Sequence, residues 1–231
     1  MAYQLPLELK IKPSSHLKKF IFGDDLYLKD LLEQQLSDNG ELLIYLIGSP
    51  KSGKTHLLLG QCHAAQNMGM KIAYFSCSDI KNVEPEVLLG LDQLDFLAID
   101  DIDKLAGDKK WEKSIFNLFN KAREANCRLL FSATKAATNI TFSLEDLQSR
   151  LTWGITLKIK ELSDNYKKNL LQNLAKRRGL DMSNAIANFL IDHHKRDNHS
   201  LQILIETLDH YSLAEKRKLS IPFVKERLKT L

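Results

Sequence analysis

The sequence predicts an α/β fold in which a mostly parallel five-stranded sheet lies between helices, followed by a small all-helical domain. Five short apolar runs alternate with helical patterns before residue 160, and only helical patterns come after it. Strands separated by helices favour parallel pairing, with helices on both faces of the sheet. We therefore expect an extended tail at 1–15, an α/β domain at 16–160 and a helical domain at 161–231.

The expected elements follow one another along the chain. Residues 1–15 contain two prolines and no helical period, which indicates an extended tail. The expected strands cover residues 42–47, 71–76, 96–99, 128–131 and 155–159, and the helices between them cover residues 25–36, 55–67 and 111–125. The second domain is expected to hold helices at 163–178, 183–193, 200–214 and 221–231.

Composition excludes several protein classes. The chain has 231 residues, 44% apolar and 27% charged, which argues against a disordered chain. Its apolar runs are far shorter than the roughly 18 residues that span a bilayer, and the first residues lack a signal-peptide pattern. Three cysteines without C-x-x-C spacing indicate neither a disulfide framework nor a zinc site. We expect a cytoplasmic protein that does not bind membranes.

The net charge of +4 is unevenly placed. Residues 1–160 carry 20 basic and 20 acidic side chains, whereas residues 161–231 carry 13 basic and 9 acidic ones. A solvated helical surface explains the excess of basic side chains in residues 161–231 as well as nucleic-acid binding does.

A phosphate-binding pattern, G-x-x-x-x-G-K-[ST], lies between the first strand and the following helix. Its residues are Gly48, Ser49, Pro50, Lys51, Ser52, Gly53, Lys54 and Thr55. The glycines let successive backbone N–H groups point at a phosphate, and the helix adds its positive N-terminal end. In this pattern Lys54 reaches the β- and γ-phosphates and the Thr55 hydroxyl binds Mg²⁺. The pattern and its context predict that the chain binds a nucleotide.

A second acidic pattern follows 46 residues later, where an apolar strand ends in Asp100 and Asp101. A carboxylate at such a strand end can hold the Mg²⁺ that bridges the phosphates, and we assign this role to Asp100. Asp101 would then orient an attacking water. Asp103 is expected to solvate the next turn. Two carboxylates after an apolar strand are common in themselves, and the preceding phosphate loop makes this pair specific.

These motifs together resemble an AAA+ module. The segment 146–154, DLQSRLTWG, is similar to the arginine-bearing segment of the bacterial replication initiator DnaA. In the segment 20–24, Phe22 and Gly23 belong to an F-x-x-G stretch that in the DnaA group lies against the nucleotide base. The stretch 217–225, RKLSIPFVK, resembles the C-terminal segment of proteins of the Hda family of DnaA-related regulators. Members of that family lack the helix-turn-helix module with which DnaA reads DNA.

The resemblance implies a partner for the N-terminal tail. Gln4, Leu5, Leu7 and Leu9 fit the pattern Q-L-x-L-x-L, similar to the motif by which the Hda family holds the sliding clamp, the β subunit of DNA polymerase III. In an extended peptide the glutamine can fix the register while the leucines fill an apolar pocket. A frayed terminus with three leucines is the alternative that the residues alone leave open.

The resemblance also implies a function. In the family, the arginine at position 150 is the finger presented to the nucleotide of a neighbouring subunit, where a guanidinium stabilises charge on the transferring phosphoryl group. The chain is then a negative regulator of replication initiation. The resemblance implies that it binds ADP or ATP with Mg²⁺ in its own site, docks on the clamp and stimulates hydrolysis of DnaA-bound ATP through Arg150. It contacts DNA mainly through the clamp.

Three departures from the family pattern predict weak or no ATP turnover by the chain alone. Asp101 is one methylene shorter than the usual glutamate, and His199 stands where an arginine normally contacts the γ-phosphate. Thr134 follows the fourth strand where the family has an acidic or amide side chain. The resemblance leaves open a homo-oligomer.

Two other functions remain open at this point. A self-contained AAA+ ATPase that loads a helicase or remodels DNA would use the same phosphate loop, because this fold hosts many activities. A DNA-binding initiator fragment gains some support from the basic runs at 176–178 and 216–218. Basic residues at helix ends also complement the helix dipole, so these runs do not decide the matter.

Overall fold

The computed structural model describes residues 17, 20–80 and 83–228. The chain divides between Lys160 and Glu161 into two compact units, which are described separately. In the residues that are described, no helix has both the length and the apolar character needed to cross a membrane.

The first unit is built on a five-stranded sheet in the order β2-β3-β4-β1-β5, in which every pair of neighbouring strands is parallel. The strands are β1 (Leu43–Ile47), β2 (Ile72–Ser76), β3 (Phe96–Asp100), β4 (Arg128–Ala133) and β5 (Ile155–Lys158). This confirms the predicted fold class, and each strand lies within two residues of its predicted bounds.

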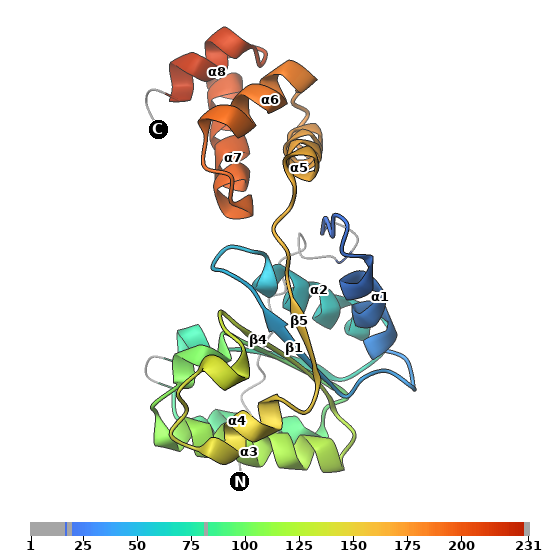
Figure 1. The fold of residues 1–231 in the computed structure, drawn as a ribbon. Coiled ribbons are helices and arrows are strands. Elements are labelled where there is room, and N and C mark those ends of the chain that lie inside the picture. Colours follow the sequence, from blue (N-terminus) through green and yellow to red (C-terminus); the bar gives the residue numbers. More distant parts are fainter. Residues whose placement is uncertain (1–16, 18–19, 81–82, 229–231) are drawn as a thin grey trace. The chain divides into compact units, whose positions relative to one another are not determined.

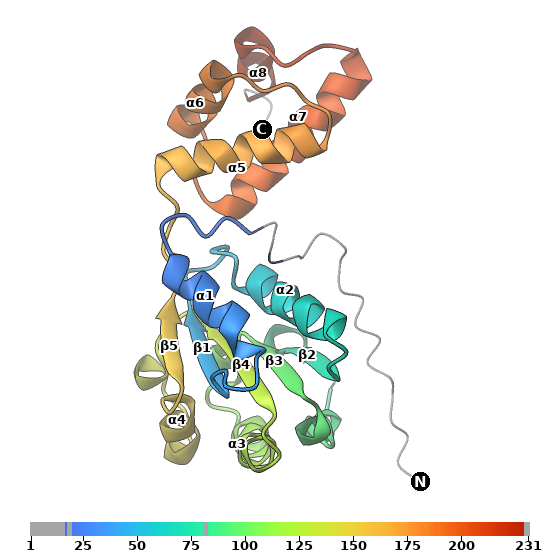
Figure 2. The same ribbon diagram turned by 90° about the vertical axis from the view of Figure 1, so that its right-hand side faces the viewer.

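Helices cover both faces of the sheet (Figures 1 and 2). α1 (Leu26–Gln35) and α2 (Lys54–Asn67) pack on one face, against side chains such as Ile44 and Leu46 of β1. α3 (Lys109–Glu124) and α4 (Glu145–Leu151) pack on the other face, against the alternate side chains of the same strand. Because successive residues of a strand point to opposite faces, a continuous apolar strand supplies both cores.

The connections contain short helical segments that the sequence patterns did not predict. Within the residues that are described, five of them are 3-10 helices: η2 (Cys77–Asp79), η3 (Pro85–Leu88), η4 (Leu91–Gln93), η5 (Ile102–Leu105) and η6 (Ala137–Asn139). The sixth is α4, which has seven residues. Segments of this length carry too few turns for a helical period to be recognised.

The described part of the second unit, residues 161–228, consists of four helices around one apolar core. They are α5 (Asp164–Arg177), α6 (Asn184–His193), α7 (Asn198–Glu215) and α8 (Ile221–Leu228), and they follow the predicted helices closely. The side chain of Ser183 accepts a hydrogen bond from the backbone N–H of Ile186 at 3.4 Å and so caps α6.

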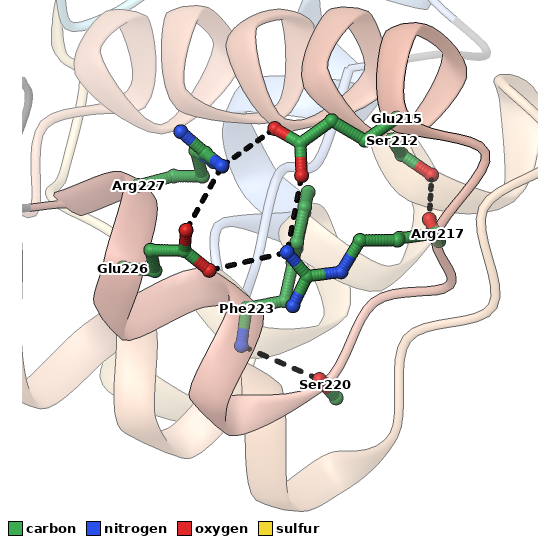
Figure 3. A network of polar contacts seen from close by, with 7 residues as sticks. All are labelled: Ser212, Glu215, Arg217, Ser220, Phe223, Glu226 and Arg227. Carbon is green, nitrogen blue, oxygen red and sulfur yellow. Dashed lines mark hydrogen bonds and ion pairs between the residues drawn. The ribbon is translucent and has the colours of Figure 1, made fainter.

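An ionic network joins the end of α7 to α8 (Figure 3). Glu215 pairs with Arg217 at 3.1 Å and with Arg227 at 2.7 Å, and Glu226 pairs with the same two arginines. Phe223 packs in the apolar core beneath these charges, 5.0 Å from the Arg217 guanidinium. Several shared charges hold one another in place better than an isolated surface pair does.

Candidate functional site

The phosphate loop joins the end of β1 to the start of α2, as predicted. Gly53 has φ 104°, and a side chain there would approach the Phe20 ring to 2.8 Å, so this position requires glycine. Lys54 is buried, and its ammonium group donates to the carbonyls of Gly48 at 3.0 Å and Ser49 at 3.4 Å. The lysine therefore lies within the loop, at the N-terminus of α2.

This arrangement fits a bound phosphate. The Ser52 hydroxyl is buried and has no hydrogen-bond partner among the described residues. Lys54 supplies a buried positive charge whose hydrogen-bond partners, among the residues that the structure describes, are the loop's own carbonyls. Together with the first N–H groups of α2, these donors suit the oxygens of a nucleoside phosphate. Lys54 and Ser52 would contact the phosphates, and Thr55 with Asp100 would hold Mg²⁺, which supplies charge neutralisation between the phosphates.

The Asp100 carboxylate lies at the carboxyl end of β3 and is almost fully buried. Its Oδ2 atom accepts hydrogen bonds from the Thr55 hydroxyl at 2.6 Å and from the Tyr74 hydroxyl at 2.9 Å. Its Oδ1 atom accepts a hydrogen bond from the Ser132 hydroxyl. The structure thus brings Thr55 and Asp100 together, as the sequence motifs predicted, and adds two hydroxyls that the motifs did not indicate.

Asp101 takes a left-handed backbone conformation with φ 54° and ψ 45°, which is uncommon for a residue with a side chain. Its backbone N–H donates to the Ser132 hydroxyl oxygen at 3.0 Å, and its Oδ2 atom accepts a hydrogen bond from the Ser78 hydroxyl at 2.8 Å. The carboxylate predicted to orient water is therefore engaged by a residue of η2.

Thr134, which directly follows β4, pairs with Asp103 of η5. The Oδ2 atom of Asp103 accepts hydrogen bonds from the Thr134 hydroxyl at 2.5 Å and from its backbone N–H at 3.3 Å. The sequence predicted that Asp103 solvates the next turn, whereas in the structure its carboxylate binds Thr134. A hydroxyl has one proton, so in this arrangement Thr134 cannot also donate to a phosphate.

The F-x-x-G stretch packs beside the phosphate loop. The Phe20 and Phe22 rings meet edge to face with centroids 4.8 Å apart, and the Phe20 ring is 5.7 Å from the His56 ring in the first turn of α2. Gly23 has φ 62°. The stretch that was assigned to the base side of the nucleotide therefore lies near the N-terminus of α2, with Phe20 against Gly53.

Arg150 lies on the opposite face of the sheet from α2. It is at the end of α4, and its guanidinium carbon is 3.9 Å from the centroid of the Trp153 ring and 5.9 Å from that of Phe116 in α3. Arg123 stacks on the same indole at 4.4 Å. Within the described part of the chain, no carboxylate pairs with Arg150.

Two residues hold the segment that carries Arg150. The buried Glu112 carboxylate of α3 accepts backbone hydrogen bonds from Ser143 at 3.1 Å and Leu144 at 2.8 Å, just before α4. After α4, Gly154 lies so close to β1 that a side chain would come within 2.2 Å of the Leu43 carbonyl oxygen. Nothing in the local sequence marked Glu112 as a buried anchor of this segment.

The remaining predicted site residues stay predictions. His199 lies in the first turn of α7, in the second unit. The residues of the predicted clamp motif, Gln4, Leu5, Leu7 and Leu9, lie outside the described residues.

Comparison with protein families gives two adjacent matches. Residues 16–158 match the model of the bacterial DnaA ATPase domain. Residues 164–228 match the model of the Hda lid domain. This chain belongs to the Hda family of DnaA-related AAA+ proteins. The family membership agrees with the resemblance seen in the sequence motifs.

The chain is also similar to a curated protein and to a solved structure over nearly its whole length. An uncharacterized protein of Haemophilus influenzae is 36% identical to this Hda-family chain over 229 residues, which is 99% of both chains. Domain III of the Thermotoga maritima replication initiation protein DnaA has the same fold, with a TM-score of 0.82 at 18% identity, covering 94% of this chain and 97% of that one.

Two further solved structures show how widely the fold is used. The AMPPCP-bound DnaA of Aquifex aeolicus has a TM-score of 0.78 at 21% identity, covering 95% of this chain and 72% of that chain. The RuvB branch migration motor of Thermotoga maritima has a TM-score of 0.73 at 19% identity, covering 96% of this chain and 73% of that chain. At such identities the likeness concerns the fold alone.

Proposed function

We propose that this Hda-family protein is a negative regulator of replication initiation that stimulates hydrolysis of ATP bound to DnaA. In this proposal it binds ADP or ATP with Mg²⁺ at its own phosphate loop, docks on the sliding clamp and contacts DNA mainly through the clamp. Arg150 is offered to the nucleotide of the partner.

The environment of Arg150 is the observation that carries the proposal. Its guanidinium is held by the Trp153 indole rather than by a carboxylate of the described residues, so its charge and donors stay available. α4 packs on the sheet face opposite α2, whose N-terminus holds Lys54 and Thr55. An arginine in this place suits a nucleotide bound by a second protein better than one bound by its own chain. An arginine finger that one protein supplies to the nucleotide of another raises the rate of hydrolysis about 10³-fold to 10⁵-fold.

The chain's own nucleotide would serve mainly as a bound ligand. The Thr134 hydroxyl and backbone N–H are engaged by Asp103, and the Asp101 carboxylate is engaged by Ser78. Each contact would have to be exchanged before these residues could act on a γ-phosphate or a water. This supports weak turnover in isolation and disfavours the self-contained ATPase that loads a helicase or remodels DNA.

The experiment is single-turnover hydrolysis of ATP already bound to DnaA from the same host. The reaction receives DNA-loaded clamp and this protein, as wild type, Arg150→Ala or Arg177→Ala. Arg177 is an exposed arginine at the end of α5, so its variant is a control for the loss of one surface charge. We expect acceleration by the wild type and by Arg177→Ala, and none by Arg150→Ala or without clamp.

Two results would contradict the proposal. Equal acceleration by Arg150→Ala and wild type would remove Arg150 from the catalytic role. Absence of acceleration under every clamp and nucleotide condition, together with substantial ATP turnover by the protein alone, would favour the self-contained ATPase. A chain without residues 1–10 separates the tail from the rest, because we expect it to lose clamp binding and keep nucleotide binding.

A further inference from the structure

The carboxylate of Asp100 is held by three hydroxyls from three different elements. Thr55 belongs to α2, Tyr74 to β2 and Ser132 to β4, and all three donate to this one carboxylate. The parallel order β2-β3-β4 places the two flanking strands on either side of β3, so their side chains reach Asp100 from both sides. None of these contacts joins residues that are close in sequence.

The contacts use most of the acceptor capacity of the carboxylate. An ionised carboxylate has about four lone-pair directions, and the two oxygens of Asp100 accept three hydrogen bonds. Oδ2 receives two of them, from Thr55 and Tyr74. Counting the contacts of the described residues, the acceptor direction that stays open is on Oδ1, beside Ser132. A metal ion or its bound water would meet a carboxylate whose orientation is already set.

Tyr74 differs from Thr55 in what it can do at this site. The Thr55 hydroxyl oxygen can bind the metal while its O–H group donates a hydrogen bond to Asp100. The hydroxyl of Tyr74, in contrast, acts at this site only as a hydrogen-bond donor to Asp100. The Tyr74 hydroxyl donates to the Oδ2 atom of Asp100 at 2.9 Å, the same oxygen that accepts from Thr55. The ring packs against the core beneath α2, which fixes the position of the hydroxyl.

We propose that Tyr74 is a positioning residue for Mg²⁺ at the nucleotide site, acting through the Asp100 carboxylate. The inference rests on the proposed binding of a nucleotide with Mg²⁺. Without the Tyr74 hydroxyl, Oδ2 gains an open lone-pair direction and the carboxylate loses one of its three anchors. Loss of such an outer contact to a metal-binding group typically lowers metal affinity about 10-fold to 100-fold.

The test compares ADP affinity as a function of Mg²⁺ concentration in wild type, Tyr74→Phe and Tyr45→Phe, by titration calorimetry. Tyr45 is a matched control, because it is a fully buried tyrosine of the same sheet whose hydroxyl donates to the Lys135 carbonyl at 3.2 Å, on the other face. Thermal unfolding of all three proteins establishes that each is folded.

We expect the three proteins to bind ADP equally in the presence of a chelator. We expect Tyr74→Phe to need a Mg²⁺ concentration at least about 10-fold higher than the wild type to reach the same gain in ADP affinity. Tyr45→Phe should show the Mg²⁺ dependence of the wild type. Equal Mg²⁺ dependence of Tyr74→Phe and wild type would overturn the inference and leave the proposed function intact. An equal loss of ADP affinity with and without Mg²⁺ would make Tyr74 a packing residue only. Absence of ADP binding by the wild type would remove the proposed nucleotide site and the inference with it.

Discussion

The guanidinium of Arg150 stacks on the indole of Trp153, with 3.9 Å between the guanidinium carbon and the ring centroid. Trp153 is 49% exposed, and Arg123 stacks on the same ring at 4.4 Å. An aromatic face attracts a guanidinium without occupying its N–H donors as a carboxylate does. The indole therefore orients Arg150 while leaving its hydrogen-bonding edge available to a partner.

The first prediction concerns Trp153. Trp153→Leu should lower the stimulated rate of DnaA-bound ATP hydrolysis about twofold to fivefold, because a cation–π contact at an exposed site contributes about 0.5–1 kcal/mol. Trp153→Phe keeps a ring and should lose less. The measurement is the single-turnover rate with loaded clamp. A stimulated rate for Trp153→Leu equal to that of the wild type would show that the indole does not orient Arg150.

The second prediction concerns Glu112, which anchors the chain before α4. In Glu112→Gln one acceptor oxygen is replaced by an amide that faces backbone N–H donors, so we expect a loss of about 1–3 kcal/mol in the free energy of unfolding. Glu124→Gln changes the same charge at an exposed position of the same helix and should have little effect. Denaturant unfolding measures both, and equal stabilities for the two variants would argue against the anchor.

The third prediction concerns Lys54. Lys54→Met keeps the aliphatic stem and removes the charge, so ADP should no longer stabilise the protein against unfolding. A ligand at about 100 times its Kd adds roughly 2.7 kcal/mol to the wild type. Lys71→Met, at an exposed lysine before β2, should respond to ADP as the wild type does. Thermal shift with and without ADP measures the response, and an undiminished shift in Lys54→Met would place the nucleotide elsewhere.

The fourth prediction concerns the thiols of Cys62, Cys77 and Cys127. All three are buried, and burial raises the pKa to about 12 for Cys62 and Cys127 and raises it further for Cys77. The reactive thiolate is therefore scarce in the folded protein at pH 8. We expect disulfide-exchange reagents to label the native protein far more slowly than the unfolded one. Rapid labelling of native protein would contradict this burial.

The same thiols give a pH dependence with a definite sign. The pKa of Cys62 is higher in the folded state than the ordinary value of 9.0, so the unfolded state loses its proton first as the pH rises. This contribution to stability is complete below pH 9 and is lost between pH 9 and about 12. Cys62→Ala should lose less stability than the wild type over that range, as measured by denaturant unfolding. Parallel losses would assign the effect to other groups.

Much of the fold and part of the site could be predicted because they depend on local patterns. Apolar runs and helical periods placed the strands and the long helices, since burial acts on each segment separately. The loop 48–55 and the strand end at Asp100 were recognised because a phosphate and its metal need donors and carboxylates at fixed short spacings. The seven residues of α4 were too few to show a period.

The sequence by itself therefore determined the segments, the phosphate loop and the identity of the residues available to a nucleotide. Only the tertiary structure decided which of them meet: Tyr74 with Asp100, Thr134 with Asp103, and Glu112 with the chain before α4. These pairs are separated by 26 to 32 residues. Their contacts depend on the strand order and on the register of a parallel sheet, which arise from packing across the whole domain and leave no mark on the local sequence.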